Sequence, residues 1–405
     1  ASIDHSRQFV PERLPAGLPE WLDQGPRGGL LENIAFAYHG QIIVAPFELG
    51  RRLEMSANIS DGHVQYHPDW PEMFELDGFI EVAGRDVRFR IDDGLSSFGS
   101  EVDGTRLLLA NNAAYADLVL STQTTVDAAL QFIRATPLAQ WMDFVTPDWR
   151  GAGPITLDGT VHIPLKLAAD HIGETSFDDE FAARLDIGLS DTDLALEDYR
   201  VNLEGLSGLV NYQYPADIAA SNIRGRIFSQ PAQFDARSDE DTVIFSIVSQ
   251  AGYRDVLEVL QADDPGLLAG GFDYLAELHI ERNEAQRTRL DVVSDLAGLA
   301  VDLPGELGKL AEDAVATDLQ LYFGDEYQVL DFGYGQARGS LHVADAPLRG
   351  AIGFGQPAPE VDVSRSDLLL TGQVAGFSID EVIPDDSEQA GLLLPLRLED
   401  MLAEY

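Results

Sequence analysis

Apolar and polar residues alternate along much of this chain, and a period of two is typical of a β-strand. The clearest run covers residues 155–167, where every odd position except Gly159 is aliphatic and every even position is polar or proline. Such a strand has one apolar face and one hydrated face. Pro164 cannot donate a hydrogen bond to a neighbouring strand, so we expect it near a strand end or an edge.

The same alternation recurs from the N-terminal part of the chain to residue 370. Strands with one apolar face are typical of antiparallel sheets rather than of doubly wound parallel sheets. We expect a turn at residues 190–193, between two such segments. The residues that form the predicted apolar faces are Ile34, Phe36, Leu53, Met55, Ile59, Val87, Phe89, Ile91, Ile155, Leu157, Val161, Ile163, Leu165, Leu185, Ile187, Leu189, Leu194, Leu196, Leu278, Ile280, Leu368 and Leu370.

A short motif, apolar-x-Gly-x-apolar, returns at irregular spacing. Its glycines are Gly78, Gly159, Gly225, Gly339, Gly350 and Gly372. Glycine inside a strand indicates a bulge, a sharp bend or a close approach of another backbone. The recurrence favours one strand-level unit used many times, as in a stacked or solenoid-like sheet. The alternative is chance, because the chain has 37 glycines in 405 residues.

Helical periodicity is scarce. Apolar residues at helical spacing predict a short helix near residues 125–135, with Thr125 as N-cap, and two more near 250–261 and 305–315. These helices divide the chain into three predicted sections of strands, 1–140, 141–265 and 266–405. They are too few and too short to cover so many strands.

Charge is strongly unbalanced: 26 Lys and Arg residues face 69 Asp and Glu residues, a net charge of −43. This excludes a nucleic-acid-binding surface and docking on anionic lipids through basic patches, since both need clustered cations. We interpret the acidity as adaptation to a saline environment, where salt screens self-repulsion.

The chain has no cysteine, no apolar run of 18 residues and no signal peptide, and it starts without Met. We therefore expect a segment of a longer protein.

No catalytic constellation stands out. The chain has no G-x-S-x-G, H-E-x-x-H or complete P-loop motif. His63 and His67 are four residues apart in a predicted strand, about 13 Å, which is too far to share a metal ion. Acidic pairs follow from the composition and are interpreted as solvated surface. The sequence thus predicts no enzyme, no cofactor and no metal site.

The apolar faces are therefore the informative feature. A sheet with one apolar face must cover it by folding on itself as a sandwich, by closing as a barrel, or by curling into a trough that a ligand fills. Aliphatic side chains along a trough would suit lipid acyl chains. On the pattern alone, a sandwich core and a lipid trough explain the alternation equally well.

A series of segments, in order, is similar to a known family and covers the chain from about residue 10 to the 380s. The segments are 14–22 (LPAGLPEWL), 62–71 (GHVQYHPDWP), 76–78 (LDG), 128–138 (AALQFIRATPL), 151–154 (GAGP), 161–165 (VHIPL), 294–304 (SDLAGLAVDLP) and 370–372 (LTG). Together they resemble the central region of the YhdP family, which belongs with TamB to the AsmA-like superfamily. No single segment is a sharp motif; the ordered set carries the resemblance.

The resemblance implies a mainly β protein with a long curled antiparallel sheet that forms an elongated, repeat-like groove. It implies an interior segment of a periplasmic bridge-like lipid-transfer protein of Gram-negative bacteria, whose parent chain is anchored in the inner membrane and reaches toward the outer membrane. The implied partners are phospholipid, the two membranes through other parts of the chain, and other envelope proteins. The family brings no catalytic residues and no cofactor. The alternative is a structural or tethering β-solenoid or sandwich of the cell envelope without a lipid path.

Overall fold

The computed structural model describes residues 25–40, 52–65, 70–84, 86–110, 115–140, 142, 145–164, 181–197, 200–214, 217–239, 242–260, 264, 266–281, 288–303, 305–323, 328–343, 349–361, 367–375 and 396–404. The described chain is mainly β, as predicted, and its α-helices are α3 (Val126–Arg134) and α5 (Tyr253–Leu260). It splits into two compact units: unit 1 is Ala1–Asp198 with Asn202–Ala219, and unit 2 is Tyr199–Val201 with Ala220–Tyr405. The three predicted sections at 1–140, 141–265 and 266–405 stay a prediction.

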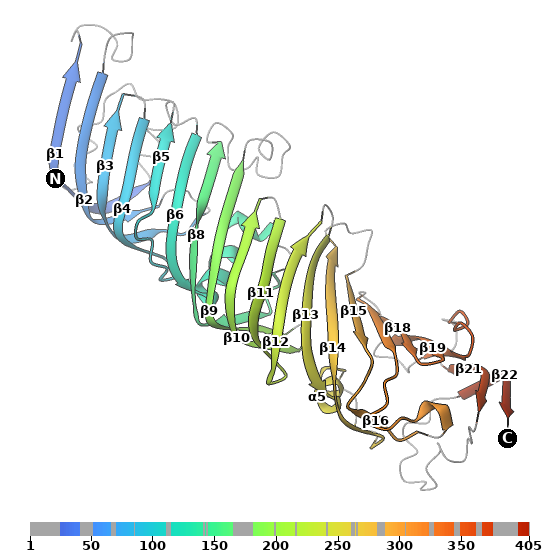
Figure 1. Cartoon of the computed structure of the whole chain (residues 1–405). Coiled ribbons are helices and arrows are strands. Elements are labelled where there is room, and N and C mark those ends of the chain that lie inside the picture. The colour runs from blue at the N-terminus through green and yellow to red at the C-terminus, as the bar shows by residue number, and fades with distance from the viewer. Residues whose placement is uncertain are drawn as a thin grey trace. The chain divides into compact units, whose positions relative to one another are not determined.

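Unit 1 is an antiparallel sheet whose strands follow one another almost in chain order (Figure 1). The exception is β6, which pairs with β8 although α3 and the short β7 lie between them in the chain. β9 pairs with β7, β8 and β10. The strands are β1 (Pro26–His39), β2 (Arg52–Val64), β3 (Met73–Ala83), β4 (Asp86–Ser96), β5 (Arg106–Ala110), β6 (Tyr115–Thr125), β7 (Trp149–Ala152), β8 (Pro154–Pro164), β9 (Ala182–Leu196) and β10 (Val201–Gln213). Pro164 ends β8, as its missing N–H predicts.

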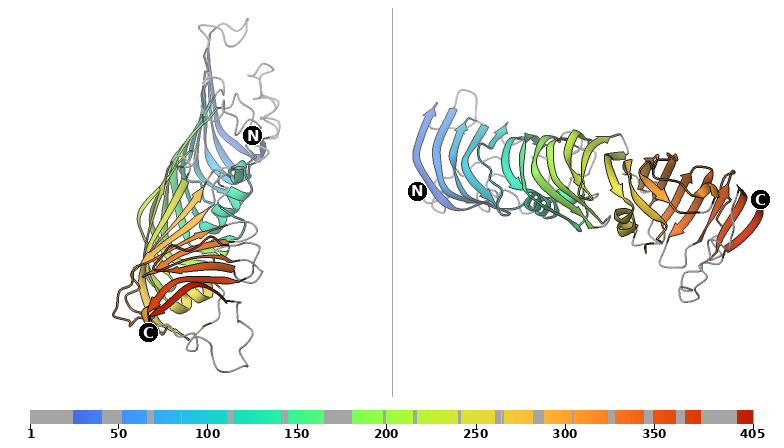
Figure 2. Two further views of the ribbon diagram at one scale, coloured as in Figure 1. Left: turned by 90° about the vertical axis from the view of Figure 1, so that its right-hand side faces the viewer. Right: turned by 60° about the horizontal axis from the view of Figure 1, so that its bottom comes forward.

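Bulges bend the long strands of unit 1 (Figure 2). Asn33, Asp61 and Glu75 have positive φ, and the pairing of β1, β2 and β3 shifts register around them. The N–H of Asp61 donates to a carboxylate oxygen of Asp77 on the next strand at 2.9 Å. A bulge adds one residue to a strand and increases its local bend, so these strands curve without ending.

The predicted turn at residues 190–193 is wrong, because this stretch is another bulge within a continuous strand. β9 runs through this stretch, and Asp191 takes a positive φ of 55° within the strand. The N–H of Asp191 donates to the hydroxyl of Ser207 at 3.1 Å. The polar run Ser190–Asp193 is therefore a bulge, which takes up an extra residue without reversing the chain.

Unit 2 is also mostly antiparallel, with parallel pairing of β20 with β21 and of β21 with β22. Sequential neighbours pair from β11 to β15, β16 pairs with β14, and β17 continues the sheet from β15. Its strands are β11 (Asp217–Ile227), β12 (Gln230–Ser238), β13 (Thr242–Gly252), β14 (Leu268–Glu281), β15 (Arg289–Ser294), β16 (Leu299–Val301), β17 (Thr317–Tyr322), β18 (Gln328–Tyr334), β19 (Ala337–Val343), β20 (Arg349–Phe354), β21 (Leu368–Ala375) and β22 (Leu396–Glu404). The prediction of an antiparallel sheet thus holds for most of the strands.

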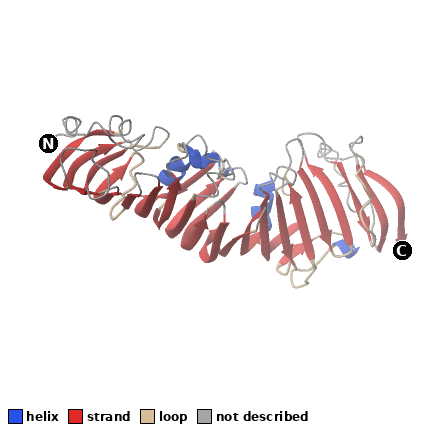
Figure 3. Cartoon of the chain, turned by 90° about the horizontal axis from the view of Figure 1, so that it is seen from above, coloured by secondary structure: helices blue, strands red, loops and turns tan. Residues whose placement is uncertain are grey.

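Two of the three predicted helices are present (Figure 3). Thr125 caps α3, and its hydroxyl accepts a hydrogen bond from the N–H of Ala128 at 3.2 Å. The helix predicted near 305–315 is wrong: this stretch has a single 3₁₀ turn, Gly305–Leu307. Gly305 has a positive φ, and Lys309 forms a β-bridge with Val301, so the backbone bonds to another segment instead of to itself.

The recurrent motif places glycine where two strands approach closely. Gly78 lies in β3 and Gly159 in β8. A Cβ added at either one would lie 2.2 Å from a backbone oxygen of the neighbouring strand, that of Arg90 or of Arg184. At these positions glycine is a steric requirement of the sheet, which chance alone does not explain.

Candidate functional site

The register of unit 1 brings the predicted apolar residues onto one face. Residues directly opposite each other on paired strands point to the same side of a sheet. Leu157 of β8 stands opposite Ile187 of β9, and Val161 of β8 stands opposite Leu118 of β6. The apolar face thus crosses the strand pairs without changing side.

The same face continues toward β1. Phe89 of β4 stands opposite Leu107 of β5 and Ile80 of β3, and Met55 of β2 stands opposite Phe36 of β1. The predicted residues on this face, which we call the apolar face of unit 1, are Ile34, Phe36, Met55, Ile59, Val87, Phe89, Ile91, Ile155, Leu157, Val161, Ile163, Leu185, Ile187, Leu189, Leu194 and Leu196. The side chain of Leu53 and all of Leu165 lie outside the described residues. Ile80, Leu107 and Leu118 also lie on this face but were not predicted, because they belong to shorter runs of alternation.

The bulge in β9 is needed for this alignment. Leu189 and Leu194 are five positions apart, so in a regular strand they would point to opposite faces. Leu189 pairs with Ile155, and Leu194 pairs with Gly151, so β9 has one residue more than the strands opposite it. The extra residue at Asp191 keeps Leu194 and Leu196 on the apolar face.

Most of the apolar face of unit 1 is not sealed. Phe36 is 66 % exposed and Ile34 is 52 % exposed, and among the predicted residues of this face described by the structure only Ile155 is buried. The other buried residues on this side are small, such as Ala116 and Ala183, apart from Leu76, which packs over Gly94 at the bulge in β3. In a sandwich core most of the large aliphatic side chains would be buried, so within the described residues no second layer covers this face.

Helix α3 covers one end of the face. A Cβ on Gly151 of β7 would lie 2.1 Å from Cγ1 of Val126, so glycine lets the helix sit directly on the strand. Leu130 of the helix is buried, and the guanidinium of Arg134 donates to the backbone oxygen of Trp149 at 2.7 Å. The buried Ile155 lies at this end of β8. Away from the helix, Leu157, Val161 and Ile163 are half-buried.

The opposite face of unit 1 is polar, as alternation predicts. Arg88 lies 3.4 Å from Glu81, and His162 lies 2.5 Å from Asp117 on the adjacent strand. A hydrogen bond from Arg90 holds the pKa of the Asp92 carboxyl below its usual range. Water and ion pairs can satisfy this face, whereas the described part of unit 1 leaves most of the apolar face without a covering segment.

In unit 2 the corresponding face is largely covered. Leu278 stands opposite Phe245 and Leu290, and Ile280 stands opposite the fully buried Val243. Leu370 of β21 stands opposite Ile352 and is itself buried, and Leu368 packs beside them. All four predicted residues of unit 2 therefore share one face with residues of the core.

The cover of unit 2 comes from helix α5 and residues 295–311. Leu299 and Val301 are buried and pack with Tyr253 of α5, Phe272 and Tyr334. The Lys309 ammonium is buried and donates to the backbone oxygen of Leu296 at 2.8 Å and to that of Leu299. Tyr274, in a second cluster with Ala251 and Ala276, is buried as well, and this burial raises its pKa to about 12. This cover could not be predicted from the sequence, because residues 295–311 have no strand-like alternation.

Within the described residues, no group of three or more His, Asp or Glu side chains could hold a metal ion. His63 lies 3.1 Å from Glu72, and His67 is outside the described part of the chain. No helix in the described ranges is long and apolar enough to span a membrane. The apolar face of unit 1 is therefore the candidate site, and what it can do is bind apolar groups.

A family model described as YhdP protein matches residues 1–396, nearly the whole chain. No curated protein and no solved structure shows a significant match.

Proposed function

This chain belongs to the YhdP family, and from that membership and its open apolar face we propose that it is an interior segment of a bridge-like lipid-transfer protein. Phospholipid acyl chains would lie along the apolar face of unit 1 while headgroups stay in water. The observation that supports this most is the exposure of Phe36 and Ile34 on a face whose other residues are mainly apolar. The proposal assigns the protein no catalytic step.

The free-energy cost of moving a lipid between membranes comes mainly from exposing its acyl tails to water. Each CH₂ group that leaves a bilayer for water costs about 0.8 kcal/mol, so two long acyl chains cost tens of kcal/mol. An apolar floor removes most of this cost, because it replaces the bilayer interior. Half-buried side chains such as Leu157 and Val161 offer contact without a deep pocket, so lipid can bind weakly and move along the strands.

The setting we propose is the periplasm, with the parent chain anchored in the inner membrane and the lipid passing toward the outer membrane. Phospholipid is the proposed ligand. The two membranes, reached through other parts of the chain, and other envelope proteins are the proposed partners. The acidic composition, with a net charge of −43, disfavours direct docking of this segment on anionic headgroups.

The test is native mass spectrometry of the purified chain together with lipid analysis of an organic extract. We expect phospholipid to co-purify with the wild type. Val161→Asp should reduce the lipid content, because a carboxylate would then lie on the apolar face. Thr160→Asp is the matched control, since Thr160 is exposed on the opposite face of the same strand. Loss of lipid in both variants alike, or lipid-free wild type in the absence of detergent, would contradict the proposal.

A structural role is the second candidate, and the covered face of unit 2 favours it for that unit. The clusters around Ala251, Leu299 and Phe354 are cores of the ordinary kind. A folded Val161→Asp chain that retains all its lipid would extend the structural role to unit 1.

A further inference from the structure

Three exposed aliphatic residues stand in line on the polar face of unit 2. Val248 of β13 is opposite Leu275 of β14, and Leu275 is opposite Val293 of β15. They are 53 %, 38 % and 47 % exposed. The registers place them on the side of the sheet opposite to the covered core residues such as Ala276 and Val292. We call these three residues the outer stripe.

The outer stripe lies between two rows of polar residues. In the next row toward one end of these strands stand Ser246, Glu277 and Asp291, and toward the other end stand Gln250 and Asp273. Alternation alone would put polar residues at all three positions of the stripe. An exposed apolar stripe with a polar rim is typical of a protein interaction surface.

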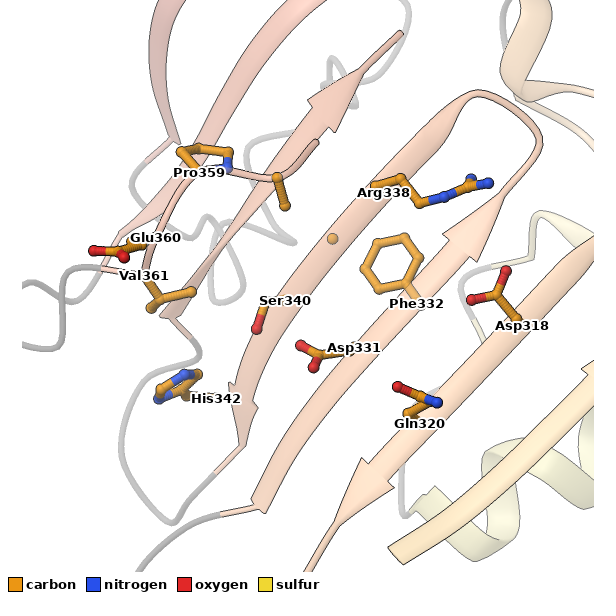
Figure 4. Close-up of a pocket in the computed structure, with 12 residues that line it drawn as sticks. Asp318, Gln320, Asp331, Phe332, Arg338, Ser340, His342, Pro359, Glu360 and Val361 are labelled. Carbon is orange, nitrogen blue, oxygen red and sulfur yellow. The ribbon is translucent and has the colours of Figure 1, made fainter. Parts of the chain in front are cut away.

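The stripe leads into a hollow on the same sheet. Val293 pairs with Asp318 of β17, and Asp318 lines a hollow of about 550 Å³ together with side chains of β18 and β19. Figure 4 shows Asp331 and Ser340 on its floor and Pro359 with Val361 on its far side. The surface thus continues from the stripe on β13–β15 to the hollow on β17–β19.

The chain itself shows what this face can hold. Residues 356–361, which include two prolines and form no helix or strand, lie against β20. A Cβ on Gly353 would lie 2.6 Å from the backbone oxygen of Pro357, and Ala351 of the same strand is completely buried. A polypeptide segment without regular structure therefore packs directly on this side of the sheet, and its residues 358–361 form one wall of the hollow.

Acidic and basic side chains both lie around the surface, and Arg237, His279 and Arg289 are engaged in ion pairs. Glu277 is bound by Arg237 at 3.0 Å, and Asp291 by Arg289 at 3.0 Å. By contrast, within the described ranges Asp273 and Asp318 form no ion pair, whereas the charge of Asp331 acts on His342 in the hollow. Arg338 lies in the hollow but donates to the backbone oxygens of Gly335 and Ala337. The surface therefore carries two carboxylates outside ion pairs, Asp318 at the end of the stripe and Asp273 in the row beside it.

From these observations we propose that the outer stripe and the adjoining hollow form a docking surface for an extended segment of a partner protein with alternating aliphatic and basic side chains. The aliphatic side chains would cover Val248, Leu275 and Val293. The basic side chains would reach Asp273, Asp318 and Asp331. This surface lies on the opposite side of the sheet from the core of unit 2, and the proposal does not depend on lipid transfer.

The test uses the purified chain and a fluorescein-labelled peptide of alternating Val and Lys residues, with binding followed by fluorescence anisotropy. The triple variant Val248→Ser, Leu275→Ser, Val293→Ser should weaken binding by at least about tenfold, because most of the apolar contact is lost. Asp318→Asn with Asp331→Asn should weaken it as well, and should also reduce its dependence on salt. A peptide with Glu in place of Lys should not bind.

Val119→Ser is the matched control, because Val119 is 47 % exposed on the polar face of unit 1. It should leave peptide binding unchanged, which separates docking on the stripe from general attraction of a cation to an acidic protein. Circular dichroism checks that each variant is folded, and Leu275→Gln alone serves if the triple variant is not.

The proposal is overturned if the Val–Lys peptide does not bind, or if the triple variant binds it as the wild type does. It is also overturned if Val119→Ser weakens binding as much as the triple variant. Binding of uncharged phosphatidylcholine vesicles that the triple variant abolishes, without binding of the peptide, would assign the stripe to a membrane surface instead.

Discussion

Units 1 and 2 use the same alternating strands, yet they expose their apolar faces to different degrees. In unit 1 the large residues of that face are half-buried or exposed, as Phe36 shows at 66 %. In unit 2 comparable residues are buried, as Phe234 and Phe354 show at 9 % each. The difference is in what lies over the sheet. One helix covers an end of the face in unit 1, whereas α5 and residues 295–311 pack on it in unit 2.

Alternation therefore determines the face of the sheet to which a side chain points, but it does not determine whether another segment covers that face. Cover depends on segments with little periodicity of their own, whose packing arises from tertiary contacts.

A buried charge should distinguish the two units most strongly. Val243→Asp places a carboxylate at a position that is 1 % exposed and should lower the free energy of unfolding by roughly 3–5 kcal/mol. Phe36→Asp, on the open face, should cost less than about 1 kcal/mol, since the carboxylate stays hydrated. All four Trp residues, Trp21, Trp70, Trp141 and Trp149, belong to unit 1, so Trp fluorescence in urea follows that unit and far-UV circular dichroism follows both. Equal losses for the two variants would contradict the contrast between open and covered faces.

Removing the buried ammonium should loosen the cover of unit 2. Lys309→Met keeps most of the side-chain volume but leaves the backbone oxygens of Leu296 and Leu299 without their donor. We expect a loss of roughly 2–3 kcal/mol, and hydrogen exchange should become faster in residues 295–311. Unchanged exchange in that segment would mean that apolar packing alone holds it.

A methyl group at Gly151 should disturb the cover of unit 1. Gly151→Ala would place a Cβ 2.1 Å from Val126, so α3 must shift, at a cost of about 1–2 kcal/mol. The fluorescence of Trp149, two residues away, should change with it. Gly28→Ala is the control, because its Cβ would meet nothing closer than 3.8 Å. If both variants have the same stability, the helix does not depend on this contact.

The smallest effect concerns the polar face of unit 2 and acid pH. A hydrogen bond from Arg237 is the main cause that lowers the pKa of Glu277, and Ser246 and His279 add to it. A carboxyl with a lowered pKa stabilises the fold above its ordinary pKa, and this contribution disappears as the pH falls through the lowered value. Arg237→Gln should therefore reduce stability by less than about 1 kcal/mol at neutral pH, because the pair is partly exposed. The deficit should vanish when urea unfolding is repeated in strong acid; a deficit independent of pH would show that the arginine acts by packing.

Much of the fold could be predicted from local patterns. The run that begins at Ile155 predicted β8 and its end at Pro164, and Thr125 predicted the start of α3. The turn expected at 190–193 was wrong because polar residues in a bulge have the same composition as those in a turn. The helix expected near 305–315 was wrong because Lys309 pairs with Val301, a contact that helical spacing cannot reveal.

The candidate site was predicted only in part. The apolar side of each strand followed from alternation, and the register confirms that these residues share a face. That the face is open in unit 1 and covered in unit 2 depends on the positions of Val126, Lys309 and Leu299 in three dimensions. The binding of lipid to the open residues stays a prediction.

The most direct test of the central claim is photo-crosslinking of phospholipid to two neighbouring positions of β8. A photoreactive amino acid is placed at position 161, on the apolar face, or at position 160, on the polar face, and the chain is incubated with phosphatidylcholine that carries a radioactive acyl chain. The account predicts labelling at position 161 and little at position 160. Equal labelling at both positions, or none at 161, would contradict the claim that the open face of unit 1 binds acyl chains.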